Sequence, residues 1–104
     1  MSTYDPDIGE DIAIDSEDKL AEPPLYKVLL HNDDYTTKAF VVEVLVAVFH
    51  KSLEEAMQLM WHVHRNGVGV CGVYPYEMAE TKVKTVTALA REHGFPLKSS
   101  LEED

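Results

Sequence analysis

The sequence contains a single cysteine and no long hydrophobic run, and both absences limit what the chain can be. One cysteine, Cys71, cannot form a disulfide within the chain, which suits a reducing compartment. The apolar stretch over residues 41–49 is interrupted by Glu43, so no membrane-spanning helix is expected. The N-terminus lacks a basic region followed by an apolar segment, so we expect no signal peptide and a cytoplasmic protein.

Basic residues are also scarce, with 9 Lys and Arg against 19 Asp and Glu and a net charge of −10. Eight acidic residues and one lysine give residues 1–24 a charge of −7, and the last three residues add −3. Residues 25–101 hold eight acids and eight bases and are neutral overall. Nucleic-acid binding requires a basic surface, so no nucleic-acid partner is expected. The distribution predicts an acidic, disordered extension over residues 1–24 and a core domain over residues 25–104.

Motifs for catalysis and metal binding are missing as well. The sequence has no nucleophile elbow, phosphate-binding loop or zinc-ligand spacing. His62 and His64 are two residues apart, so on a helix their side chains point in different directions and do not suit one metal ion. Asp33 and Asp34 lack an accompanying nucleophile. We therefore expect no enzyme, no metal site and no cofactor, and a hydrolase using Asp33, Asp34 and His64 is only the third hypothesis.

What the sequence does contain is an ordered series of strand-like and helix-like segments. Strand patterns lie at residues 26–30, at residues 68–74 and after Leu97 to about residue 101. Helical spacing of apolar residues extends from Thr37 to about His50, from Ser52 to Gly67 and from Tyr76 to Gly94. The order β-α-α-β-α-β predicts one compact α+β domain in which three helices pack on a small antiparallel three-stranded sheet. Nothing in the sequence requires more than a monomer.

Local signals refine this prediction. Ser52, followed three residues later by Glu55, matches a capping box at the start of the second helix. Gly67 is a typical helix end. Gly69 and Gly72, both inside a strand pattern, indicate a β-bulge or a close approach of another backbone.

A polar run, Asn32-Asp33-Asp34, separates the first strand from the first helix. One helix cap uses one side-chain oxygen, so three polar groups exceed that need and could form the mouth of a binding site. His64 shares a helix face with Met60 and could contribute to the same site. The plainer interpretation is that the run only ends a strand and caps a helix. The residues alone leave both interpretations open.

Four blocks, in order, resemble the ClpS family. They are residues 26–36, Gln58-Leu59-Met60 with Val63-His64, Cys71-Gly72-Val73, and Ala79-Glu80-Thr81-Lys82-Val83. The family consists of adaptor proteins for substrates with an N-degron, a free N-terminal Phe, Leu, Tyr or Trp. They deliver these substrates to a ClpA- or ClpC-type AAA+ unfoldase of the Clp protease. The resemblance therefore implies two partners, an N-degron peptide and the N-terminal domain of the unfoldase.

The resemblance also implies residue roles. It assigns the substrate's α-amino group to Asn32, Asp34 and His64. It assigns the hydrophobic pocket for the first side chain to Thr36, Lys38, Val41, Met60, Val63 and Leu97. Glu77 and Lys82 match positions at which family members touch the unfoldase.

The chain departs from the family at Lys38, where a Met or another bulky apolar residue often guards the pocket rim. A lysine places a charge near the incoming α-ammonium, so we expect weaker exclusion of Ile and Val and a lower affinity. Trp61 and His62 are also unusual between the matched Met60 and Val63. The alternative hypothesis is a protein-interaction domain of similar architecture without a pocket for an amino terminus.

Overall fold

The computed structural model describes residues 23–104, and their helices and strands follow the predicted order. The elements are β1 (Leu25–His31), α2 (Lys38–Ala47), α3 (Leu53–Asn66), β2 (Val68–Pro75), α4 (Tyr76–Glu92) and β3 (Lys98–Glu103). Strand β1 is central and pairs antiparallel with both β2 and β3. This confirms the predicted fold. The predicted extension lies outside the described residues, apart from Pro23 and Pro24, and stays a prediction.

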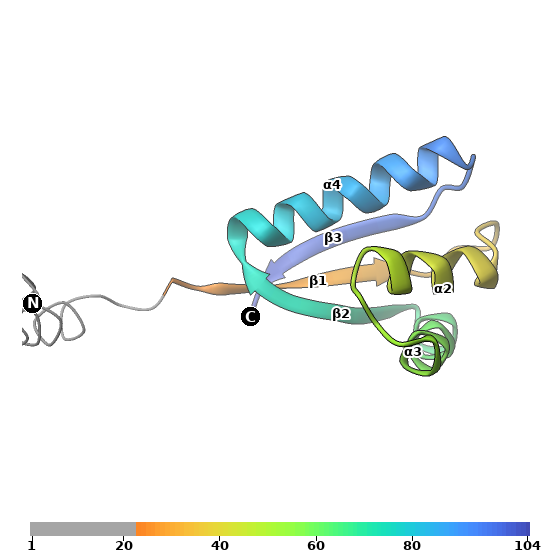
Figure 1. Cartoon of the computed structure of the whole chain (residues 1–104), viewed down its shortest axis with the longest axis horizontal. Coiled ribbons are helices and arrows are strands. Elements are labelled where there is room, and N and C mark those ends of the chain that lie inside the picture. The colour runs from red at the N-terminus through yellow and green to blue at the C-terminus, as the bar shows by residue number, and fades with distance from the viewer. Residues whose placement is uncertain (1–22) are drawn as a thin grey trace, which may run out of the picture.

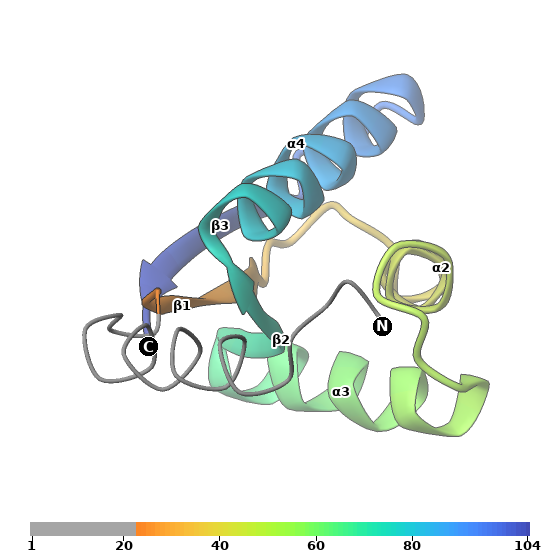
Figure 2. The same cartoon turned by 60° about the vertical axis from the view of Figure 1, so that its left-hand side comes forward.

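The helices cover the sheet from several sides. Figures 1 and 2 show α4 along β3 and α3 beside β2, and α2, which a loop joins to β1, packs against α3. Val28 and Leu30 of β1 are fully buried and form the centre of the core together with Val44 and Leu45 of α2. Within residues 23–104, no helix is long and apolar enough to cross a membrane.

The glycines of β2 explain how α3 approaches the sheet. A β-carbon placed on Gly69 would lie 2.7 Å from Val63 Cγ2, so only glycine allows this contact between β2 and α3. Between Val28 and Leu29 of β1, the register skips Cys71 of β2, which is a β-bulge beside Gly72. Of the two predicted alternatives, the bulge is confirmed, whereas the close neighbours of both glycines are side chains and not another backbone. Cys71 itself is buried, and burial raises the pKa of its thiol to about 12.

Helix α2 is shorter than predicted, because it ends at Ala47 and not near His50. His50 adopts a left-handed backbone (φ 57°), which histidine tolerates better than most residues, and this turns the chain toward α3. The Lys82 ammonium, held on α4, donates to the Val48 carbonyl at 2.6 Å and satisfies one of the free carbonyls at this helix end. The end of α2 therefore combines a local turn at His50 with a contact from a residue distant in sequence.

The end of β1 is joined to the end of α3 by backbone. Helix α3 begins with the predicted capping box of Ser52 and Glu55 and ends at Gly67, which adopts the left-handed conformation (φ 88°). The Asn32 amide donates a hydrogen bond to the Gly67 carbonyl at 2.8 Å. The loop that follows β1 therefore has a defined position relative to α3.

The same loop, residues 32–37, is shaped by Asp33. Its carboxylate accepts hydrogen bonds from the Tyr35 amide (2.8 Å), the Thr36 amide (2.6 Å) and the Thr36 hydroxyl (2.7 Å). Thr37, the next residue, is the N-cap of α2 and accepts from the Phe40 amide. Burial alone would raise the pKa of Asp33, but the bonds from Thr36 and Tyr35 outweigh it and lower that pKa below its ordinary value.

We predict that Asp33 stabilises the fold in a pH-dependent way. Because its pKa is lower in the folded state, its contribution is fully present above the ordinary value of 3.8 and is lost as the pH falls through the folded-state pKa. Asp33→Ala should reduce the free energy of unfolding by about 1 kcal/mol at neutral pH. Urea denaturation between roughly pH 6 and pH 3 should show the two proteins converging as the pH falls.

Asp33→Asn is the matched control, because its amide oxygen keeps the acceptor of the turn without the titrating charge. It should be more stable than Asp33→Ala at neutral pH. A difference between wild type and Asp33→Ala that stays constant over the whole pH range would contradict the role of the ionised carboxylate.

Candidate functional site

A cavity of about 160 Å³ opens where the end of β1, the loop 32–37, α2 and α3 meet. For scale, a closed apolar cavity of about 150 Å³ is large enough to hold benzene. The lining residues are His31, Asn32, Asp33, Asp34, Thr36, Lys38, Val41, Met60, Val63, His64 and Leu97. All nine residues predicted for the amino group and the hydrophobic pocket are therefore brought together in one place. The role of each stays a prediction.

The inner wall of the cavity is apolar. Val41, Met60, Val63 and Leu97 are each at most 8% exposed, although they come from α2, α3 and the segment before β3. Helix α3 supplies Met60, Val63 and His64 from one face, since residues three and four apart are neighbours on a helix. This wall suits a large apolar group.

Leu97 reaches this wall because the chain turns back after α4. The Phe95 amide donates to the Ala90 carbonyl at 2.8 Å, and Gly94 takes a left-handed conformation (φ 77°). The Phe95 ring then packs on Phe40 of α2, with ring centroids 4.8 Å apart. This turn places Leu97 in the same cavity wall as Met60 and Val63, which lie more than thirty positions earlier in the chain.

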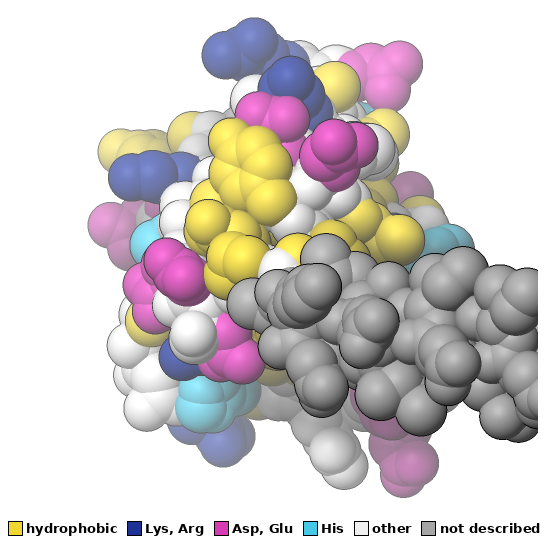
Figure 3. All heavy atoms as spheres, turned by 90° about the vertical axis from the view of Figure 1, so that its left-hand side faces the viewer, with side chains coloured by type: hydrophobic (Ala, Val, Ile, Leu, Met, Phe, Trp, Pro, Cys, Tyr) yellow, Lys and Arg dark blue, Asp and Glu magenta, His cyan; other side chains and the backbone are white. Residues whose placement is uncertain are grey.

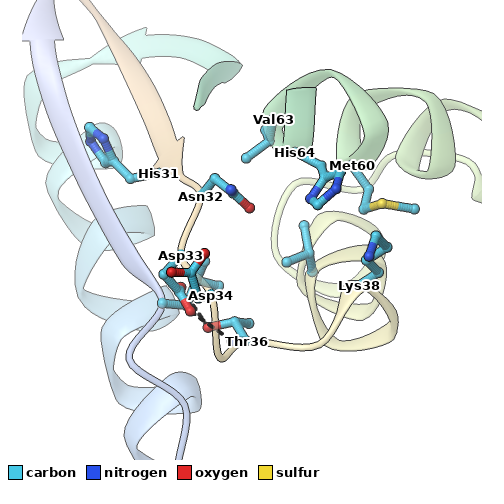
Figure 4. A pocket seen from close by; sticks show the side chains of 11 residues that line it. His31, Asn32, Asp33, Asp34, Thr36, Lys38, Met60, Val63 and His64 are labelled. Atoms are coloured by element: carbon cyan, nitrogen blue, oxygen red, sulfur yellow. Dashed lines mark hydrogen bonds between the residues drawn. The ribbon is translucent and has the colours of Figure 1, made fainter. Parts of the chain in front are cut away.

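The mouth of the cavity is polar. Asn32, Asp34, Lys38 and His64 are exposed, and Thr36 is half-buried. In Figure 4 the Asn32 amide points across the opening toward His64, so the two side chains face each other from β1 and α3. With Asp33 engaged in its turn, these exposed groups are available to a ligand.

The plainer interpretation of the Asn32-Asp33-Asp34 run does not describe what the structure contains. Thr37 caps α2, Asp33 closes the turn, and no side-chain hydrogen bond within residues 23–104 engages Asn32 or Asp34. A run that only ended a strand and capped a helix would use these two side chains for that purpose. The two side chains that neither the turn nor the helix cap uses, Asn32 and Asp34, therefore lie at the cavity mouth.

Lys38 and Trp61 lie together at the rim. The Lys38 ammonium is 5.6 Å from the centroid of the Trp61 ring, within the range of a cation–π interaction. The Arg65 guanidinium lies 5.5 Å from the same ring, and the His64 ring meets it edge-on at 5.8 Å. Trp61 is 39% exposed, so it extends the surface beside the mouth and does not enter the core.

Two further histidines, His31 and His62, face groups other than the cavity. His31 also lines it, yet its side chain points toward β3 in Figure 4, where its ring nitrogen is 2.7 Å from the Ser100 hydroxyl. His62 Nδ1 is 3.1 Å from the side-chain amide nitrogen of Asn66, and the His62 ring packs near Gly69.

Within the described residues 23–104, no three His, Cys, Asp or Glu side chains form a group that could hold a metal ion. His31 was not predicted to line the cavity, although it adjoins Asn32, and Asp33 was predicted only as part of the polar run, without a role of its own.

The residues predicted to contact the unfoldase lie on α4. Glu77 is exposed in the first turn of α4, next to exposed Tyr76 and Met78. Figure 3 views the side on which α4 begins and shows hydrophobic side chains gathered there beside acidic ones. Lys82 is half-buried, with its ammonium bound to the Val48 carbonyl and lying over the rings of Phe49 and Tyr74. Lys82 therefore has a structural contact within this chain.

Comparison with known proteins gives a consistent result. Residues 21–100 match the family model described as the ATP-dependent Clp protease adaptor protein ClpS. An ATP-dependent Clp protease adapter protein ClpS from Desulforapulum autotrophicum is 53% identical over 104 residues, covering the whole of both chains. One from Myxococcus xanthus is 63% identical over 86 residues, covering 83% of this chain and 80% of the relative.

A solved structure agrees with the fold and the family. The structure of Agrobacterium tumefaciens ClpS2 bound to L-phenylalaninamide superposes with a TM-score of 0.78 and is 46% identical. The match covers 80% of this chain and all of the other. With the family model spanning most of the sequence and relatives more than half identical, this chain belongs to the ClpS family of Clp protease adaptors.

Proposed function

We propose that this chain binds substrates that begin with Phe, Leu, Tyr or Trp and delivers them to a ClpA- or ClpC-type unfoldase, without catalysing a reaction itself. The observation that supports this most is the cavity, which combines an apolar inner wall with a mouth containing Asn32, Asp34 and His64. The cytoplasmic location expected from the sequence stays a prediction.

The mouth suits an α-ammonium group, which needs hydrogen-bond acceptors. The Asn32 amide oxygen, the Asp34 carboxylate and a neutral His64 ring can all accept, and Asn32 and His64 face each other across the opening. Each charge-assisted hydrogen bond contributes roughly 1.5–3 kcal/mol. In our proposal Asn32 and His64 bind the ammonium directly, and Asp34 acts through water or through its charge.

The inner wall suits the first side chain of the substrate. Burying a Phe or Leu side chain contributes roughly 1.5–3 kcal/mol, and the cavity has the volume for an aromatic ring. L-Phenylalaninamide, the ligand of the related ClpS2 structure, has both features that we assign here, a free amino group and a large apolar side chain. These two contributions, set against the entropy lost on binding, are compatible with an affinity near the micromolar range, about −8 kcal/mol.

We predict that a peptide with a free N-terminal Leu or Phe binds and that its N-acetylated twin does not. Acetylation removes the positive charge and two donors, so the affinity should fall at least tenfold for each bond lost, or about 1.4 kcal/mol. Fluorescence anisotropy with peptides labelled at the C-terminus measures both. Equal affinities for the two peptides would exclude recognition of the amino group.

Asn32→Ala should abolish peptide binding while the protein stays folded. The Asn32 side chain is exposed, and its structural contact with Gly67 is made by the backbone amide, which alanine keeps. Asn66→Ala is a matched control, because Asn66 is the other asparagine of the chain and hydrogen-bonds within its own helix, away from the cavity. An Asn32→Ala variant that is less stable but, while folded, keeps the wild-type peptide affinity would contradict the role of Asn32 and favour an interaction domain without an amino-terminus pocket.

The proposed unfoldase surface is well separated from the cavity. The start of β1 pairs with the end of β2 next to α4 (Leu25 with Pro75), whereas His31, at the other end of β1, adjoins the mouth. Seven strand residues span about 20 Å. We therefore propose that the peptide and the unfoldase N-terminal domain can be bound at the same time, with Glu77 at the second interface and Lys82 shaping it from a half-buried position.

Glu77→Arg should weaken binding to the N-terminal domain of a ClpA- or ClpC-type unfoldase by at least tenfold, about 1.4 kcal/mol, because it reverses an exposed charge within the interface. Peptide affinity should be unchanged. Glu92→Arg, the charge reversal of another exposed glutamate at the other end of α4, is the control and should retain both interactions. Loss of peptide binding in Glu77→Arg, or equal effects of both variants on the unfoldase, would contradict two separate surfaces.

A further inference from the structure

Trp61 is the only tryptophan of the chain and lies beside the cavity without lining it. It follows Met60, which forms part of the inner wall, and its ring contacts His64 at the mouth. Because the Trp61 ring is partly exposed, it leaves apolar surface in contact with water. It contributes less to the core than the buried side chains of α3 do. The residues around the Trp61 ring indicate which kind of ligand group would bind there.

Two cations from different elements meet at this ring. Lys38 of α2 and Arg65 of α3 lie 5.6 and 5.5 Å from its centroid, and both side chains are exposed. Within residues 23–104 the single ion pair joins Lys27 and Asp104, so neither cation is neutralised by a carboxylate there. The indole holds both cations in place, and no carboxylate among residues 23–104 forms an ion pair with either of them.

The cavity mouth is therefore divided by charge. Asp33 and Asp34 lie on the side of the loop 32–37, whereas Lys38 and Arg65 lie on the side of the helices, around Trp61. His64, which we assign to the substrate's α-ammonium, contacts the Trp61 ring, so a second residue that leaves the mouth on the side of His64 lies beside Trp61, Lys38 and Arg65. The residue after the N-degron then meets an aromatic surface flanked by positive charge.

We propose that Trp61, Lys38 and Arg65 form a subsite for the second residue of the substrate and that this subsite favours an acidic side chain over a basic one. The inference rests on the proposed N-degron function and adds a preference at a second position. The net charge of the whole chain, −10, acts in the opposite direction, but at a distance and screened by salt. In this proposal the second side chain lies next to Lys38 and Arg65, where their nearby charges outweigh the distant and screened ones.

The test compares peptides that begin with free Leu-Asp, Leu-Asn and Leu-Lys and are otherwise identical. At low ionic strength, Leu-Asp should bind about two- to fivefold more tightly than Leu-Asn, and Leu-Lys more weakly than Leu-Asn, as for exposed charge pairs. The differences should shrink at about 0.5 M salt. Equal affinities of all three peptides would overturn the subsite, while binding of none of them would overturn the N-degron function as well.

Arg65→Gln is the decisive variant, because Arg65 does not line the cavity. It should reduce the preference for Leu-Asp over Leu-Lys, and Lys38→Met should do the same while keeping an apolar stem at the rim. Arg91→Gln on α4 changes the net charge by the same unit away from the cavity, so it should leave the preference intact. Equal effects of Arg65→Gln and Arg91→Gln would mean that only the overall charge matters, which would also overturn the proposal.

Intrinsic fluorescence gives an independent readout, because all tryptophan emission comes from Trp61. At saturation, Leu-Asp amide should change the emission more than leucinamide, which has no second residue. Identical spectra with the two ligands would show that the second residue does not reach the indole.

Discussion

The backbone hydrogen bond from Asn32 to the Gly67 carbonyl holds the two sides of the cavity at a defined separation. It joins the first residue after β1 to the left-handed residue that ends α3. The Asn32 side chain thereby faces His64, which is presented from the last turn of α3. Without this connection, the polar loop and the helix face would be two unrelated surfaces, and neither alone would form the proposed site for a charged amino terminus.

The two parts of the site follow opposite physical requirements. The inner wall is built from core side chains on three segments. These side chains must pack tightly against the rest of the core, so that the cavity keeps its shape. The mouth needs polar groups with free acceptors, which are costly to bury, and these lie on an exposed loop and helix end. Asp33 reconciles the two, because its three hydrogen bonds hold the loop in shape and leave Asn32 and Asp34 unoccupied.

Much of the fold followed from local signals in the sequence. The capping box of Ser52 and Glu55, the helix end at Gly67 and the bulge beside Gly72 each depend on a few neighbouring residues, and all three were predicted. The end of α2 was not, because it depends on Lys82 of α4 and on the backbone of His50. The nine pocket residues were named through the resemblance to ClpS, since no periodicity relates Leu97 to Asn32 or Met60.

The sequence by itself determined the order of the elements, the family and the polar run at the end of β1, because each is written in adjacent or regularly spaced residues. Only the tertiary structure decided which polar groups remain free and what surrounds Trp61. Asp33, Asn32 and Asp34 have similar chemistry in the sequence, yet only Asp33 is used within its own loop. Lys38 and Arg65 are separated by 27 positions and meet at one ring because α2 packs against α3.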